Sequence, residues 1–420
     1  MRNRVKNNLL LAVIRQSIAA GFRLAVRTAL IFPVLPILYL LEPVLRVRVG
    51  VLFTRRIGHL AVNTDALLRK IQRGDPESKN FYVLVGCEPA NNQLLKILKR
   101  HIRILEGTWP TRLGFASKVI LKHTRFWEPL GWTGTEYELI NSTEPVLAFT
   151  GDEEQEGIRQ LVEMGIGPGD WFVCFHARDS AYLMKKFEND SEHWQAIDYK
   201  NCDISNYMMA AEYVTSLGGF AIRMGALVSD PMPQTSNPKI IDYATTFRND
   251  FMDIYLSAKC RFFLGASSGL NAVPTAFGVP VAIANHVPHT HTHYHRCDLV
   301  IPRLIERRVD QTLVSFRDAT DEGFQAGSKG SEVLIAGGPF GWRESSPDDI
   351  LDLCKDMIDV IDGREPTPEQ QVLQTRYADE YFSHLPNYQL GARVAPRFLE
   401  KYKDLVFKKT GVQTQHKHSL

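Results

Sequence analysis

The residues best suited to chemistry follow an apolar segment in the middle of the chain. Residues 171–179 read WFVCFHARD, which predicts a buried strand that ends near Phe175. His176, Arg178 and Asp179 would then place a base, a permanent cation and a carboxylate at the end of that strand. The planar guanidinium group of Arg178 suits a phosphate, because it can donate to two oxygens at once. A structural Arg178–Asp179 pair that closes a loop is the alternative interpretation.

A turn of small residues is the second candidate. CRFFLGASSG, residues 260–269, predicts a strand followed by a turn, and LNAVPTAFG after it predicts a helix. Ser267, Ser268 and Gly269 would therefore stand where the backbone N–H groups of a helix N-terminus can hold a phosphate. The turn matches neither a Walker loop nor GxGxxG, and a tight turn with a serine N-cap is the alternative.

Other polar residues stand at the predicted ends of further strands. Arg223 ends FAIRMG, Asp242 ends KIID and Asn285 ends VPVAIAN. Near the start of the chain, His59 follows the first predicted strand, where it could act as a base. The alternatives are a surface arginine for Arg223 and a loop histidine without a catalytic role for His59.

A histidine-rich stretch, NHVPHTHTHYH, covers residues 285–295 and holds five of the chain's 13 histidines. Four of them alternate (His289, His291, His293 and His295), so they would share one face of an extended segment. The nearest acid is Asp298, and metal-binding histidines usually need such partners. We therefore expect a loop at the rim of the site, and no metal centre.

These strand ends require elements that bring them together. Strand-like and helical runs alternate in two successive series along the 420 residues, which predicts parallel sheets covered on both faces. We predict an α/β fold of two Rossmann-like, doubly wound domains that face a cleft, with ligands at the carboxyl ends of the strands. The predicted domains are residues 46–150 and 151–400, with a tail at 401–420. Residues 108–150 are expected to be loops.

Composition narrows the class of protein. With 44% hydrophobic and 23% charged residues, the body of the chain is globular. The six cysteines form no CxxC pair, so we expect reduced, buried thiols and no zinc ribbon or disulfide framework.

Basic charge is concentrated at the N-terminus. Ten of the 49 Lys and Arg residues fall within residues 1–60, where Glu42 is the only acid. Residues 9–32 predict an amphipathic helix with arginines on one side, and the apolar run at 28–41 is short and interrupted by prolines. We predict that residues 1–45 lie in a membrane interface and do not bind nucleic acid. A terminal helix packed on the body or on another subunit is the alternative.

Several segments, in collinear order from about residue 50 to 400, resemble a family of bacterial surface-polysaccharide glycosyltransferases. The resemblance implies a GT-B fold, with the acceptor on the N-terminal domain and a nucleotide-sugar donor on the C-terminal one. The H-x-R segment at 176–178 is also similar to that of the fucosyltransferase-like group, in which the arginine contacts the donor diphosphate. The matching segments are RIGHLA, NNQLLKILKR, FHARDSAY, NCDISNY, IRMG, IIDYA, RNDFMDIYLSAKCRFFLGASSG, FGVPVAIAN and SPDDI.

If the family's site residues are carried over by position, the resemblance implies that Arg178 contacts the donor diphosphate. It also implies that Ser267, Ser268 and Gly269 lie beside this diphosphate. The resemblance assigns roles to His176, Asp179 and Arg223 less directly. The N-terminal segment has no counterpart among the family's motifs. The chain lacks an isolated DxD motif, so we expect catalysis without an essential divalent ion.

The predicted function is transfer of a sugar from a nucleotide-sugar to a glycan or lipid-linked acceptor in surface polysaccharide biosynthesis. The enzyme would be peripheral, at the cytoplasmic face of the inner membrane. A sugar-nucleotide epimerase or hydrolase of the same fold is one alternative, and it would need no membrane segment. A non-catalytic membrane scaffold is the other, and it would need no arginines at strand ends.

Overall fold

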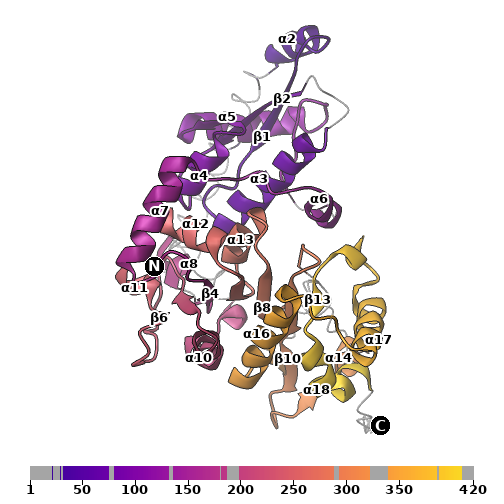
Figure 1. The fold of residues 1–420 in the computed structure, drawn as a ribbon. Coiled ribbons are helices and arrows are strands. Elements are labelled where there is room, and N and C mark those ends of the chain that lie inside the picture. Colours follow the sequence, from indigo (N-terminus) through magenta and orange to yellow (C-terminus); the bar gives the residue numbers. More distant parts are fainter. Residues whose placement is uncertain are drawn as a thin grey trace, which may run out of the picture. The chain divides into compact units, whose positions relative to one another are not determined.

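The computed structural model describes residues 32–74, 80–131, 136–179, 181–186, 198–287, 293–321, 339–385 and 387–408, together with residues 21 and 29. Its contacts divide the chain into two units, Met1–Trp132 and Thr133–Leu420, and each is described by itself (Figure 1). The predicted boundary lay at residue 150. Phe149, however, packs inside the second unit, where its ring stacks on Phe277 with 5.4 Å between the centroids.

The first unit is built on a parallel three-stranded sheet in the order β1-β2-β3. After the third strand and its helix, the chain returns to the free edge of β1, where Trp127 pairs in parallel with Val49. This return reverses the strand order, as in a doubly wound sheet. The elements are β1 Arg46–Val51, α3 Ile57–Gln72, β2 Asn80–Gly86, α4 Asn92–Leu98, β3 Arg103–Glu106 and α5 Thr108–Leu121.

Helix α5 lies in a region that was predicted to form loops. Its buried face is made largely of small residues, including Thr111, Gly114 and Ser117, so no period of large apolar residues marks it in the sequence. A Cβ atom on Gly114 would come within 2.4 Å of Val85 Cγ2, so the helix lies very close to β2. Close packing through small residues therefore explains why the prediction was wrong.

A short helix, α2 Val34–Leu41, precedes β1 and packs on the first unit. Leu38 is buried against Leu121 and Phe126, and the Tyr39 ring meets Phe126 edge-on with 4.9 Å between centroids. Residues 34–41 are thus part of the folded unit, although residues 1–45 were predicted as a separate segment. The arginine-bearing part of that segment lies outside the described residues. Within the described part of the chain, no helix has both the length and the apolar character needed to span a bilayer.

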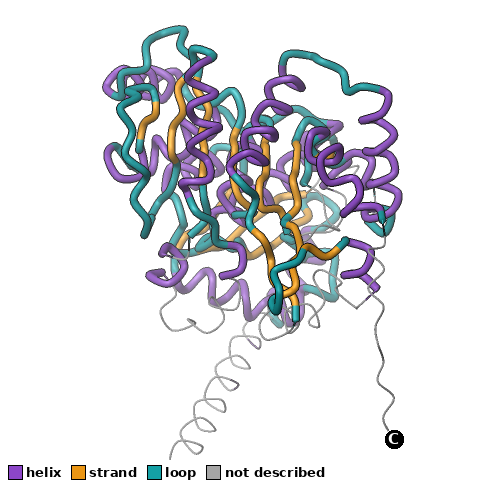
Figure 2. The backbone as a smooth tube through the Cα atoms, turned by 90° about the horizontal axis from the view of Figure 1, so that it is seen from below, coloured by secondary structure: helices purple, strands orange, loops and turns teal. Residues whose placement is uncertain are grey.

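The second unit contains a seven-stranded parallel sheet in the order β13-β9-β8-β7-β4-β5-β6 (Figures 1 and 2). From β4 the chain adds β5 and β6 on one side, and then returns to the other side of β4 to add β7, β8 and β9. This is the strand order of a Rossmann fold, so the predicted doubly wound α/β sheet is confirmed in this unit. The strands are β4 Phe172–His176, β5 Phe220–Arg223, β6 Ile240–Ile241, β7 Phe263–Ala266, β8 Val281–His286, β9 Leu299–Pro302 and β13 Arg393–Val394.

A small antiparallel sheet in the order β11-β10-β12 follows β9. It consists of β10 Leu304–Arg307, β11 Leu313–Val314 and β12 Phe340–Arg343. The helices of the second unit are α6 Glu136–Ser142, α7 Gly151–Glu163, α8 Ala181–Lys186, α10 Met208–Ser216, α11 Tyr243–Thr246, α12 Asp250–Lys259, α13 Ala272–Ala276, α14 Phe316–Asp321, α16 Pro347–Ile361, α17 Pro368–Tyr377 and α18 Pro396–Phe407.

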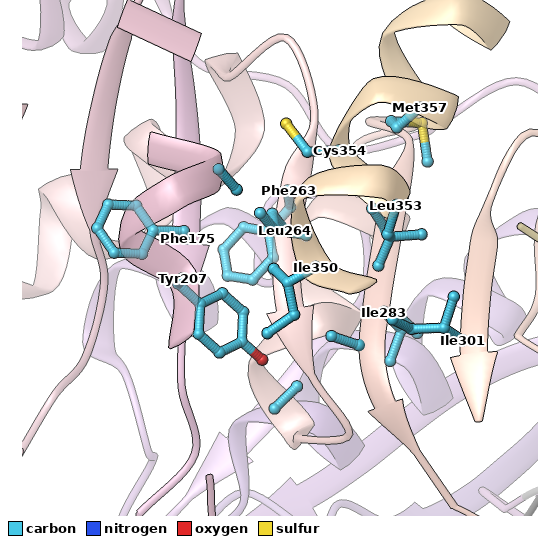
Figure 3. Packing of buried hydrophobic residues seen from close by; sticks show 14 of the residues in the cluster. Phe175, Tyr207, Phe263, Leu264, Ile283, Ile301, Ile350, Leu353, Cys354 and Met357 are labelled. Carbon is cyan, nitrogen blue, oxygen red and sulfur yellow. The ribbon is translucent and has the colours of Figure 1, made fainter. Parts of the chain in front are cut away.

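The core of the second unit lies between the long sheet and helix α16. Figure 3 shows Ile350 and Leu353 of this helix among apolar side chains of β7 and β8. A capping box of Ser346 and Asp349 begins α16, as its sequence predicts. At the C-terminus, α18 continues to Phe407, which is buried, so the predicted tail at 401–420 begins inside a packed helix.

Candidate functional site

The predicted site residues of the second unit lie along one edge of its long sheet. His176 ends β4, Arg223 ends β5 and Asn285 lies in β8, while Asp242 follows β6 and the turn at 267–269 follows β7. Because all these strands are parallel, their carboxyl ends share this edge. The strand order reverses between the neighbours β4 and β7, where His176 pairs with Gly265. Open α/β sheets bind their ligands outside the carboxyl ends at such a reversal.

His176 is held in one tautomer by the backbone of the next strand. Its Nδ1 lies 3.0 Å from the carbonyl oxygen of Met224, and a carbonyl only accepts. Nδ1 therefore carries the hydrogen, and Nε2 presents a lone pair. Burial lowers the pKa of His176, and the positive charges of Arg223 and Arg178 lower it further. The side chain is a neutral acceptor that could take a proton from a hydroxyl group.

The depressed pKa of His176 predicts a specific dependence of stability on pH. Below about pH 6.5 an unfolded histidine binds a proton that the folded His176 does not, so stability is lost as the pH falls through this range. Between about pH 7.5 and pH 5, we expect the melting temperature of a His176→Gln variant to fall less than that of the wild type. His123→Gln, at an exposed position, is the control. Equal losses in wild type and His176→Gln would contradict this assignment.

Two buried arginines from different strand ends hold one connecting segment. Arg178 donates from Nη1 to Asn201 Oδ1. Arg303, which directly follows β9, donates from Nη1 to Tyr199 O at 2.7 Å and from Nη2 to Asn201 O. Arg303 was not predicted, although an arginine after the apolar run LVIP is the same signal that singled out Arg223. The two guanidinium groups place two positive charges at this end of the sheet, and the carboxylate of Glu344 lies close enough to Arg303 for their charges to interact.

Asp179 has a structural role in the described contacts. Its Oδ1 accepts a hydrogen bond from Ala181 N–H at 2.9 Å, and its Oδ2 accepts one from Ser229 N–H at 3.0 Å. The carboxylate thus ties the loop after β4 to the loop after β5. A loop-closing function for Asp179 is favoured over a catalytic one, although its partners are backbone amides and not Arg178.

The buried Arg223 forms an ion pair with the partly buried Asp242 at the ends of β5 and β6. Arg223 Nη1 lies 3.3 Å from Asp242 Oδ2, and Nη2 donates to Asp230 O at 2.6 Å. Arg223 is buried, not at the surface as one interpretation held. Asp242 Oδ1 is buried, and no hydrogen-bond partner for it is found in the described part of the chain. Since the arginine is occupied by protein oxygens, its first role is to join two strand ends.

The turn after β7 differs from its prediction in two ways. The helix expected at 270–278 is a 3₁₀ turn, Gly269–Asn271, followed by the five residues of α13, so it has little dipole to offer a phosphate. Ser268 makes no capping hydrogen bond, and its Oγ is buried without a partner among the described residues. Asn271 Nδ2 donates to Ala266 O at 2.8 Å and fixes the turn. A buried hydroxyl group is therefore left available beside β4.

Asn285 has a structural role in joining β8 to the segment before α16. Its Oδ1 accepts from Ser345 N–H at 2.8 Å, and its own N–H donates to Ser345 Oγ at 3.3 Å. The residue has φ of 55°, a conformation that asparagine tolerates better than most residues. The side chain is fully buried, so a direct contact with a ligand is not what its geometry favours.

In the 285–295 stretch, His293 and His295 make hydrogen bonds within their own loop. His293 Nδ1 lies 2.6 Å from Asp298 Oδ2, and His295 Nδ1 accepts from Cys297 N–H at 3.1 Å. His289 and His291 lie outside the described residues. Among the residues that the structure does describe, no cluster of three potential metal ligands occurs.

His59 belongs to the first unit and is part of a helix, not of a loop as predicted. It occupies the first turn of α3, with its ring 5.5 Å from that of Phe53 and its Nδ1 3.4 Å from Asn63 Nδ2. Partial burial and the charge of Arg56 lower its pKa, so it too is a neutral base. Its role as a base toward an acceptor stays a prediction.

Comparisons with known proteins lead to glycosyltransferases of solved structure. No protein-family model matches the chain, and no curated protein matches it. The chain is similar to a glycosyl transferase family 9 protein from Veillonella parvula, with 10% identity and a TM-score of 0.46, over 74% of this chain and 97% of that one. It is also similar to the E. coli heptosyltransferase WaaC with ADP, with 8% identity and a TM-score of 0.29, over 66% and 96% of the two chains. A third similar structure is the iron-containing dodecameric glycosyltransferase TibC from enterotoxigenic E. coli, with 12% identity, a TM-score of 0.29, and coverage of 57% and 58%. No family membership follows from these similarities.

Proposed function

We propose that the chain is a glycosyltransferase whose nucleotide-sugar site lies at the carboxyl ends of β4 and β7. One observation carries this proposal: where the strand order reverses, His176 and Arg178 lie at the end of β4, and the Ser268 hydroxyl group, which has no hydrogen-bond partner among the described residues, follows the adjacent β7. The arrangement offers a neutral acceptor, a permanent cation and a hydroxyl group at two neighbouring strand ends. These are the groups that a diphosphate and the hydroxyl groups of a sugar require.

In the proposed reaction, the bond between the anomeric carbon and the diphosphate breaks while an acceptor hydroxyl group attacks that carbon. Negative charge develops on the departing diphosphate, and Arg178 stabilises it with a prepositioned guanidinium group. His176 Nε2 accepts a hydrogen bond or the proton of a hydroxyl group. Because a guanidinium group can stabilise the negative charge of the departing diphosphate and a hydroxyl group can donate a hydrogen bond to it, we propose that no divalent ion is essential.

The acceptor is proposed to be a glycan or a lipid-linked glycan of a surface polysaccharide, reached at the cytoplasmic face of the inner membrane. Support comes from the described part of residues 1–45. There, Leu40 and Val44 are 80% and 81% exposed. Exposed apolar side chains of this size are typical of a peripheral membrane segment.

A donor screen tests the proposed function. The melting temperature is measured with UDP-, GDP-, CMP- and ADP-sugars, and a donor at 100 times its dissociation constant should add about 2.7 kcal/mol of stability. Ser268→Ala should melt as the wild type does without donor, because Oγ has no hydrogen-bond partner in the part of the chain that the structure describes, but should show a smaller donor shift. Ser216→Ala, at an exposed position in the last turn of α10, is the control for removing a serine hydroxyl group away from the proposed site.

Two outcomes would count against the proposed function. If no nucleotide sugar raises the melting temperature, the donor site is wrong. If a donor is bound and consumed equally with and without a glycan or lipid-linked acceptor, the reaction is hydrolysis or epimerisation and not transfer.

A further inference from the structure

Helix α5 of the first unit turns large apolar side chains outward. Trp109, Leu113, Phe115 and Val119 are all exposed on it. A surface helix normally directs its large apolar residues to the core and its polar residues to solvent. In α5 this distribution is reversed, since small residues such as Gly114 face the sheet. The exposed apolar side chains are therefore not needed to hold the helix in place.

The charge around this helix is predominantly positive. Residues 89–127 contain eight Lys and Arg residues and a single acid, Glu106, which pairs with Lys99. On and next to α5, Arg112, Lys118 and Lys122 are exposed beside the apolar residues. Residues 1–132 as a whole contain 22 Lys and Arg and seven Asp and Glu, whereas residues 133–420 contain 27 and 40. The apolar face thus lies in the strongly basic part of the protein.

We propose that the exposed face of α5, defined by Trp109, Arg112, Phe115, Lys118 and Val119, binds the surface of an anionic lipid bilayer. In this arrangement the apolar side chains enter the headgroup region, where tryptophan is favoured, and the basic side chains stay near the lipid phosphates. Large aliphatic and aromatic residues between the cations favour a bilayer over a nucleic acid, whose phosphates offer no apolar surface in which phenylalanine and valine could be buried.

The position of helix α2 supports this assignment. Leu38 of α2 packs on Leu121, the last residue of α5, so the two helices adjoin within the first unit. Both expose large apolar residues, and no acid is present in either helix. The α5 face is a surface distinct from residues 1–45, and its assignment does not depend on the proposed glycosyl transfer.

The test uses three pairs of exposed apolar residues, each four positions apart in the chain. Phe115 and Val119 on α5 are 50% and 45% exposed, and Ile158 and Val162 on the acidic helix α7 of the second unit are 48% and 54% exposed. The full-length variants Phe115→Gln/Val119→Gln and Ile158→Gln/Val162→Gln are therefore matched. Leu40→Gln/Val44→Gln tests the separate membrane proposal for residues 1–45. Sedimentation with phosphatidylcholine vesicles, with and without phosphatidylglycerol, measures the binding.

We expect the wild type and the α7 variant to bind vesicles that contain phosphatidylglycerol, and more weakly as salt is raised. The α5 variant should bind roughly tenfold more weakly or worse, with an unchanged melting temperature.

Equal binding by the α5 and α7 variants would overturn the assignment. So would an α5 variant that melts earlier but binds vesicles normally, because the face would then be covered by protein. Loss of binding in the α2 variant alone would support the 1–45 proposal and overturn that for α5. The rise in melting temperature on adding a nucleotide sugar, measured on the same variants, shows separately whether the proposed donor site is present. Loss of vesicle binding can therefore be distinguished from failure of the proposed transfer.

Discussion

Replacing Arg178 by alanine should lower the rate of sugar transfer roughly 100- to 1,000-fold, the loss expected when one donor to a developing oxyanion is removed. The side chain is buried at the end of β4, so no mobile surface cation can take its place. Arg178→Lys should recover only part of the rate, because an ammonium group keeps the charge but loses the planar fork. The measurement is the steady-state rate with the donor identified by the melting screen.

Arg178 also donates to Asn201, so a structural explanation must be separated from a catalytic one. Asn201→Ala removes that contact and leaves the guanidinium group in place. We expect this control to lose much less activity than Arg178→Ala. If Asn201→Ala is as inactive as Arg178→Ala, the arginine acts by positioning the 199–201 segment. Wild-type transfer by Arg178→Ala would rule out the proposed site.

The sequence was sufficient to predict which residues stand at strand ends. Apolar runs such as FVCF and FAI end in polar residues where buried strands reach solvent, and parallel pairing brings those ends to one edge. His176, Arg223 and the turn at 267–269 were all predicted correctly in this sense. Composition and spacing therefore determine much of the sheet and of its functional edge.

The hydrogen-bond partners at that edge could not be predicted in the same way. Asp179 binds the amide of Ser229, and Asn285 binds that of Ser345, in both cases through loops far away in the sequence. Local spacing carries no information on such contacts, because they depend on where two loops end after the sheet has formed. The partners of Arg303 likewise lie about a hundred residues earlier and could not be predicted, although its position after the apolar run LVIP could have been noticed.

Helix α5 shows a second limit of predicting secondary structure from hydrophobic periodicity. Amphipathic periodicity identifies a helix only when its buried residues are large, and those of α5 include Thr111, Gly114 and Ser117. Its large apolar residues face outward, so the pattern of residues 108–121 suggested loops. The outward position of these apolar residues is what the proposed membrane contact of α5 would explain.

Replacing Arg223 by alanine should destabilise the second unit by about 3 to 5 kcal/mol, because Asp242 would lose its cation while remaining largely buried. The change also removes the bond to Asp230 O, which fixes the loop after β5. The unfolding midpoint in denaturant measures the effect. Arg364→Ala, which breaks an ion pair on the surface, is the control and should cost less than about 1 kcal/mol. An Arg223→Ala variant as stable as the control would show that the pair contributes little.

The double variant Arg223→Met/Asp242→Asn separates the structural role of Arg223 from the donor-binding role that the sequence suggested. Removing both charges and keeping similar volumes leaves no uncompensated ion, so most of the lost stability should return. If donor binding returns with it, Arg223 serves the site only by joining β5 to β6. If the double variant is stable but still fails to bind donor, one of the two charged groups itself contacts the ligand, and donor binding by the single variant Asp242→Asn shows whether that group is Arg223.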